Sequence, residues 1–137
     1  MIIWESKLNK IQFTLVAFFG LTFITPVFAI DKNSSGEHIY KEVCSVCHTA
    51  GVANAPKLGD QNAWKKLIGE GQVIITAHGY VGVRAMPPKG GRQDLSVEQF
   101  AEALNYMVNK SGGNWSTPDK SMLDKINNEI ASRKKTQ

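Results

Sequence analysis

The five consecutive residues Cys44-Ser-Val-Cys47-His48 carry the most specific chemistry in this sequence. Cys44 and Cys47 are the only cysteines, and a histidine directly follows the second one. On a helical turn, both thiols project to one side, where each can add across a vinyl group of one porphyrin. The imidazole of His48 is then placed to bind the iron as the proximal ligand. The pattern therefore predicts one covalently attached haem c.

Other uses of these residues fit the pattern less well. A zinc site needs four Cys or His ligands, and the two remaining histidines, His38 and His78, have no zinc-finger spacing. A thioredoxin-like redox pair belongs in a strand-helix-strand context, which does not surround this motif. A disulfide between Cys44 and Cys47 would leave His48 without a role.

The second axial ligand of the iron is expected from residues 82–91, a loop rich in glycine and proline. The other methionines lie in the leader, on a helix and in the C-terminal segment: Met1, Met107 and Met122. Pro87 and Pro88 restrict Met86 to extended backbone and stiffen the loop, which suits a weakly binding thioether. A Met/His pair also raises the reduction potential relative to His/His. The alternatives are that Met86 is a plain loop residue, or that His78 is the ligand.

Two further residues are expected in the haem environment. A ligating histidine usually donates its other ring N–H to an acceptor that fixes its orientation. A carbonyl of the rigid loop Asn54-Ala-Pro56 is well placed in sequence to accept from His48. The indole N–H of Trp64 could reach a haem propionate, and the equal alternative is a core tryptophan.

Four basic residues in the loops that flank the haem edge could form a positive rim: Lys57, Arg84, Lys89 and Arg92. Such a rim would steer an acidic redox partner. Ordinary solvated side chains are an equally good interpretation of the same residues.

Hydrophobic periodicity predicts short helices throughout. A helix is expected over 35–47, with Ser34 as N-cap and Glu37 closing a capping box. Asp60 caps a second short helix through Trp64 that ends at Gly69 and Gly71. Residues 72–78 are rich in β-branched side chains, yet a short buried helix is preferred there because no hairpin partner exists.

The later part of the chain carries a stronger helix signal. Ser96 and Gln99 form a capping box, Leu95 can pack on Phe100, and the helix is expected to end before Gly112. Beyond it, residues 114–137 read as a helical extension, with Thr117 as cap and Pro118 at the first helical position. The apolar stripe of that helix consists of Met122, Ile126 and Ile130. It is expected to pack on the haem domain or fray, with docking on a partner as the alternative.

Residues 1–29 have the pattern of a secretory signal. Lys7 and Lys10 precede an apolar run over 11–28, and Ala29 stands at the expected cleavage site. The alternative is an uncleaved membrane anchor, in which case the protein would be attached to the membrane. Both interpretations export the haem domain, residues 30–113, to the periplasm.

The charge balance excludes one class of partner. The net charge is +4, and removing the leader takes away two lysines and one glutamate. Haem propionates bring the total closer to neutral. The mature chain is therefore mildly basic, and no Lys/Arg stripe of a nucleic-acid binder appears outside the last few residues.

The chain resembles bacterial monohaem class I cytochromes c, nearest to the cytochrome c-five group, from about Gly36 to Lys110. The resemblance rests on Gly-Glu-x-x-Tyr before the CSVCH motif, on Gly51-Val-Ala-Asn-Ala-Pro-Lys-Leu-Gly-Asp after it, on Trp64, and on Ala85-Met-Pro-Pro-Lys-Gly. It also rests on the closing helix that ends Tyr106-Met-Val. The c-five proteins usually carry a second cysteine pair before the last helix, and Gly91–Leu95 has none.

The resemblance implies an all-α cytochrome c fold, with the first and last helices crossing near Gly36, Tyr40 and Tyr106. It also implies iron ligation by His48 and Met86. The expected function is single-electron transfer between respiratory redox partners, without enzymatic activity. The partners would be acidic proteins or a membrane-bound oxidase or reductase. The alternatives are a haem catalyst or gas sensor with a displaceable methionine, and a tethered subunit of a larger oxidase.

Overall fold

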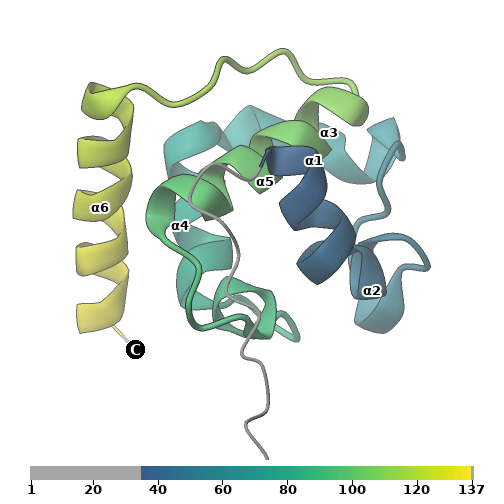
Figure 1. Ribbon diagram of the computed structural model, residues 1–137, viewed down its shortest axis with the longest axis horizontal. Helices are drawn as coiled ribbons and strands as arrows, with labels where there is room; N and C mark the ends of the chain where they lie inside the picture. Colours follow the sequence, from purple (N-terminus) through teal and green to yellow (C-terminus); the bar gives the residue numbers. More distant parts are fainter. Residues whose placement is uncertain (1–34, 137) are drawn as a thin grey trace, which may run out of the picture.

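The computed structural model describes residues 35–136, so the expected leader at residues 1–29 lies outside the described residues. The part described is built from helices and has a single isolated bridge, between Val83 and Met86. The elements are α1 (Gly36–Ile39), η1 (Tyr40–Cys44), α2 (Ser45–His48), η2 (Val52–Asn54), α3 (Gln61–Glu70), α4 (Gln72–Val81), η3 (Pro88–Gly91), α5 (Val97–Lys110) and α6 (Lys120–Lys135). The all-α prediction is confirmed (Figure 1).

The first three elements form one continuous helical segment that contains a π-helical stretch at η1. Its N-cap is Ser35, whose Oγ accepts from the His38 N–H at 3.3 Å, so the expected cap at Ser34 is wrong by one residue. With Ser35 as the cap, Glu37 no longer stands at the third helical position that a capping box requires. Its carboxylate instead pairs with Lys41 Nζ at 2.7 Å, one helical turn further on.

Helices α3 and α4 follow each other with only Gly71 between them. Asp60 caps α3 as predicted, accepting from the Ala63 N–H at 3.1 Å, and the helix continues through Gly69 to Glu70. Gly71 separates the two helices at φ +92°, a backbone conformation that suits glycine. The β-branched run after it is helical, as preferred, and extends three residues beyond the expected end to Val81.

Helix α5 begins with the predicted capping box. Gln99 N–H donates to Ser96 Oγ and Ser96 N–H donates to Gln99 Oε1, both at 3.1 Å. The helix crosses α1 closely, because a Cβ on Gly36 would collide with the backbone carbonyl of Glu102. Beside the crossing, the rings of Tyr40 and Tyr106 lie 5.5 Å apart, so the crossing expected from the resemblance is confirmed.

The segment after α5 ends in α6, which lies beside α4 (Figure 1). Its N-cap is Asp119, which accepts from the Met122 N–H at 2.8 Å. The predicted cap at Thr117 and helical start at Pro118 are therefore wrong. Ile126 and Ile130 are buried against Ala77, Val81 and Ala101. Packing on the rest of the chain, rather than an apolar face left free for docking, is thus the observed arrangement.

Within the described residues, two groups of buried side chains make up the core. The larger group joins α1, η1, α3, α4 and α5, and includes Ile39, Tyr40, Cys44, Trp64 and Phe100. The smaller group lies where α6 meets α4 and α5. Between residues 35 and 136, none of the helices is long and apolar enough to cross a membrane.

Candidate haem-binding site

The two cysteines lie at a change of helix type. Cys44 ends the π-helical stretch and is buried, whereas Cys47 lies one turn later in α2 and is half-buried. Both are free thiols, so the disulfide interpretation is not what the structure shows. Burial, and secondarily the neighbouring Cys47, raises the pKa of the Cys44 thiol to about 11.

The imidazole of His48 is held by the loop that follows it. The side chain is buried, and its Nδ1 lies 2.8 Å from the carbonyl oxygen of Pro56. Because a carbonyl can only accept, Nδ1 carries the hydrogen and donates it. The neutral ring therefore has its lone pair on Nε2, which is the atom available to a metal. The acceptor predicted from the Asn54-Ala-Pro56 loop is present, and it is the Pro56 carbonyl.

The same loop is fixed to the motif by its backbone. The Leu58 N–H donates to the carbonyl of His48 at 2.8 Å. Left-handed backbone at Gly51, Ala53 and Asn54 turns the chain back toward α2. The turns place the Pro56 carbonyl against Nδ1 of His48, and the Leu58 bond holds the loop to the backbone of the same residue. Together these contacts fix the orientation of the His48 ring.

The indole N–H of Trp64 is hydrogen-bonded within the protein. The side chain is 2 % exposed, and Nε1 donates to the carbonyl of Lys57 at 2.8 Å. Its ring centroid lies 6.2 Å from that of His48. Of the two predictions for this residue, the structure shows the core tryptophan, because the N–H proposed for a propionate is already bonded. Its place in the haem environment stays a prediction.

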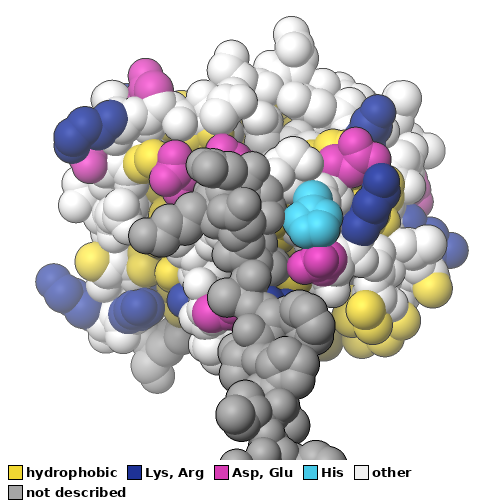
Figure 2. All heavy atoms as spheres, viewed as in Figure 1, with side chains coloured by type: hydrophobic (Ala, Val, Ile, Leu, Met, Phe, Trp, Pro, Cys, Tyr) yellow, Lys and Arg dark blue, Asp and Glu magenta, His cyan; other side chains and the backbone are white. Residues whose placement is uncertain are grey.

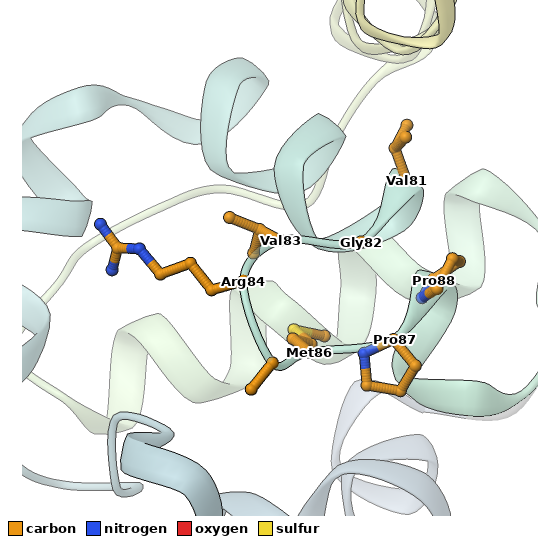
Figure 3. A pocket seen from close by; sticks show the side chains of 8 residues that line it. Val81, Gly82, Val83, Arg84, Met86, Pro87 and Pro88 are labelled. Carbon is orange, nitrogen blue, oxygen red and sulfur yellow. The ribbon is translucent and has the colours of Figure 1, made fainter. Parts of the chain in front are cut away.

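The Met86 loop, defined here as residues 82–87, is a tight turn. Val83 and Met86 exchange two backbone hydrogen bonds, of 3.1 and 2.9 Å, and Arg84 between them has φ +54°. An open hollow of about 350 Å³ is lined by this loop and its neighbours Val81 and Pro88 (Figure 3). The half-buried side chain of Met86 packs against the larger core group.

The structure brings η3, the turn directly after the Met86 loop, next to the attachment segment. A Cβ on Gly90, in η3, would lie 3.4 Å from Val43 Cγ1, in η1. Cys44 and Trp64 are members of the core group against which Met86 packs, and His48 lies beside Trp64. Three predicted site residues and the imidazole of His48 thus belong to one neighbourhood, which also includes Pro56 through its carbonyl.

The other histidines have partners of their own. His38 Nε2 lies 3.1 Å from Glu42 Oε1, and His78 Nδ1 lies 3.9 Å from Glu70 Oε2. Over the described part of the chain, no group of three or more His, Cys, Asp or Glu side chains is arranged to hold a metal ion. The zinc interpretation therefore finds no support there.

Two of the four proposed rim charges are engaged locally. Arg92 Nε donates to Asp94 Oδ1 at 2.7 Å. Lys89 Nζ donates to the carbonyl of Gln93 at 2.7 Å and lies 4.7 Å from the Tyr80 ring centroid. Lys57 and Arg84 are the exposed members of the set.

The donor set fits a haem c. It offers two free thiols three residues apart, a buried imidazole whose Nδ1 is bonded to the Pro56 carbonyl, and a thioether on a stiffened loop. Sequence reasoning missed the backbone groups of Lys57 and Leu58, because carbonyl and amide roles leave no mark on residue type. Site and fold together define a monohaem class I c-type cytochrome.

Comparison with known proteins places the chain within this class. It belongs to the family described as "Cytochrome C oxidase, cbb3-type, subunit III", whose model matches residues 31–107. It is 38% identical over 82 residues to cytochrome c-555 of Chlorobaculum thiosulfatiphilum, covering 57% of this chain and 95% of the relative. It is 41% identical over 75 residues to cytochrome c5 of Ectopseudomonas mendocina, covering 53% of this chain and 86% of the relative.

A solved structure agrees with these relatives. The chain matches one from the crystal structure of the electron transfer complex of nitrite reductase with cytochrome c, with a TM-score of 0.54 and 41% identity. The match covers 56% of this chain and 93% of the other. The resemblance to the c-five group is confirmed, and so are the haem c cofactor and the role of electron carrier rather than enzyme.

Proposed function

We propose that this protein is an exported one-electron carrier whose haem, joined to Cys44 and Cys47, is held at its iron by His48 and Met86. When bound, the haem supplies an iron that alternates between Fe(II) and Fe(III). The hydrogen bond from His48 Nδ1 to the Pro56 carbonyl carries the proposal, because it leaves Nε2 as the free ligand atom. The leader pattern of residues 1–29 supports export to the periplasm.

The role proposed for Met86 is supported by the rigidity of its loop. Two backbone hydrogen bonds close the turn, and Pro87 and Pro88 follow it directly. A thioether presented by such a loop stays in place when the iron changes charge. An electron carrier with the same two ligands in both states needs little rearrangement.

The partners we propose are other redox proteins, including membrane-bound oxidases or reductases. They would meet the uncharged face, defined here by Val46 and Val52, which are 72% and 50% exposed. Residues 43–56 contain no Asp, Glu, Lys or Arg. Apolar side chains gather over α2 in the space-filling view (Figure 2). Lys57 borders this face and favours a partner with acidic groups at the rim.

Replacing Met86 with alanine tests the ligand assignment. The ferric holoprotein should lose the absorption band of thioether-to-iron coordination, and its midpoint potential should fall by on the order of 0.1 V. The ferrous variant should also bind carbon monoxide promptly. Met122→Ala, a half-buried methionine on α6, is the matched control and should keep the wild-type spectrum and potential.

Two results would contradict the proposal. One is a Met86→Ala protein with unchanged spectrum and potential. The other is prompt binding of carbon monoxide by the wild-type ferrous protein at neutral pH, which would favour the haem catalyst or gas sensor. The structure gives that alternative little support, because His78 faces Glu70 and Arg84 points away from Met86 (Figure 3).

A further inference from the structure

We propose that α6 is a brace for the Met86 loop, and that Ile126 and Ile130 are positioning residues for the thioether of Met86. The matched family segment ends at residue 107, so this helix lies beyond the part shared with the family. The inference rests on the proposed role of Met86 as an iron ligand. It assigns to α6 the role of controlling how firmly the Met86 loop is held in place.

The connection between α5 and α6 is fixed at three points. Ser111 is fully buried, and its Oγ accepts from the Gly59 N–H at 2.9 Å. The side-chain amide of Asn109 accepts from the Trp115 N–H at 2.7 Å and donates to the Trp115 carbonyl at 2.9 Å. Gln72 Nε2 donates to the Ser116 carbonyl at 3.2 Å. The helix that follows is therefore attached to the body by more than its own packing.

The packing of α6 runs along α4 and includes its last turns. Ile126 is 0% exposed and Ile130 is 6% exposed, and both belong to one buried group with Ala77 and Val81. The small side chain of Ala77 lets the helices approach closely. Figure 3 shows Val81 pointing from the end of α4 toward α6, away from the Met86 loop.

The last turn of α4 lies next to the Met86 side chain. A Cβ on Gly79 would lie 2.8 Å from Phe100 Cζ, which is too close, and 3.6 Å from Met86 Cε, which is an ordinary contact distance. The helix ends at Val81 and leads directly into the loop, where a Cβ on Gly82 would lie 3.0 Å from Pro88. The end of α4 is thus held between α6 and the loop that carries the ligand.

It follows that weakening the α6 contacts should let the loop open more often. Local opening is set by the packing of the segment involved rather than by global stability alone. Truncating a buried isoleucine removes contacts that the surroundings replace only partly. The amides of Val83 and Met86 report opening directly, because each is hydrogen-bonded across the turn.

The experiment uses the full-length holoprotein with Ile126→Ala or Ile130→Ala. Hydrogen exchange of the Val83 and Met86 amides should become about tenfold faster. Binding of imidazole to the ferric iron should accelerate by a similar factor, because the thioether must leave first. Val108→Ala is the matched control: this fully buried valine belongs to the larger core group but lies at the far end of α5, against Gly113 and outside the contacts of α6 with α4. It should destabilise the protein without accelerating either process.

Acceleration in the α6 variants, but not in Val108→Ala, supports the brace. Wild-type exchange in the α6 variants overturns it, and so does equal acceleration in all three variants, which would mean general destabilisation. If either alanine variant fails to yield holoprotein, the valine substitution at the same position gives a smaller change in the same direction. A wild-type protein without thioether coordination would refute the ligand role of Met86, while amide exchange would still test the brace.

Discussion

Two backbone carbonyls, those of Pro56 and Lys57, orient the two rings next to the haem attachment motif. The first accepts from His48 and the second from Trp64, each at 2.8 Å. Consecutive residues of one loop thus set the tautomer of the ligand and the position of the ring beside it. An ordinary peptide group does this work because its carbonyl can only accept.

Replacing Trp64 with phenylalanine should lower the free energy of unfolding by about 1 kcal/mol, because the Lys57 carbonyl loses the shorter of its two hydrogen bonds and keeps only the one from the Asp60 N–H at 3.2 Å. Denaturant unfolding of the holoprotein measures the change. Leu67→Ala, at a half-buried position of the same helix, is the comparison for general loss of packing. A shift in midpoint potential without loss of stability would instead favour a direct contact of the indole with a haem propionate.

At residue scale, the sequence allowed the motif and the acceptor loop to be predicted because both depend on residue type and short spacing. It could not distinguish the two roles of Trp64. A tryptophan donates one hydrogen bond in either role, and only the folded loop decides which acceptor is close.

At the helix ends, the capping residue can be predicted from sequence only where a single good candidate is available. The box at Ser96 and Gln99 has no competitor and formed as predicted. At the start of α1, two adjacent serines are available and Ser35 is the cap. Glu37 pairs with Lys41 on the next turn. At α6, the carboxylate of Asp119 took the capping role expected of Thr117. Since each competing residue is itself a good cap, composition cannot rank them.

The π-helical stretch at η1 and the helical state of α4 illustrate a second limit. Residues 40–44 show no composition that separates a π turn from an α turn, because the difference lies in which amide meets which carbonyl. The β-branched residues of α4 favour a strand in isolation. Packing between α3, α5 and α6 overrides that preference.

The contact between α4 and α6 should make stability depend on pH through His78. Burial is the main cause that lowers its pKa below 6.5, and Arg133 of α6 and Arg84 of the loop act in the same direction. Glu70 of α3 and Glu129 of α6 oppose them. Below pH 6.5 the unfolded chain takes up the proton more readily, so stability should fall as the pH drops from there through the lower folded pKa.

Denaturant unfolding of wild type and His78→Gln across this pH range measures the effect. In the His78→Gln variant, the free energy of unfolding should decline less as the pH is lowered. The wild type should therefore lose stability relative to the variant toward acid pH. His38→Gln, at an exposed histidine of α1, is the control for removing one imidazole elsewhere on the surface. Parallel curves for wild type and His78→Gln would contradict the prediction.

At the scale of the whole molecule, the two core groups of the described residues support different parts of the site. The larger one joins the attachment segment to α3 and α5, and the smaller one joins α6 to α4. The uncharged face over α2 lies outside both, so its exposed valines are available for a partner. The charges around this face then affect the association rate with a partner more than the affinity of the complex.

Reversing the charge of Lys57 should therefore slow electron exchange with an acidic redox partner several-fold at low ionic strength, and added salt should abolish the difference. Stopped-flow kinetics at a series of salt concentrations measures it. Lys125→Glu makes the same charge change on an exposed position of α6 and should have a smaller effect. Equal slowing by both variants would show that net charge, rather than a defined docking face, governs the encounter.

The position of α6 in chain order affects how the protein is made. Ile126 and Ile130 follow every other member of the smaller core group, which includes Ala77, Val81 and Ala101. A growing polypeptide that has emerged only through α5 therefore still exposes those three side chains. Completion of this part of the interior must await synthesis of the residues after 120, which delays closure until that last segment has been made.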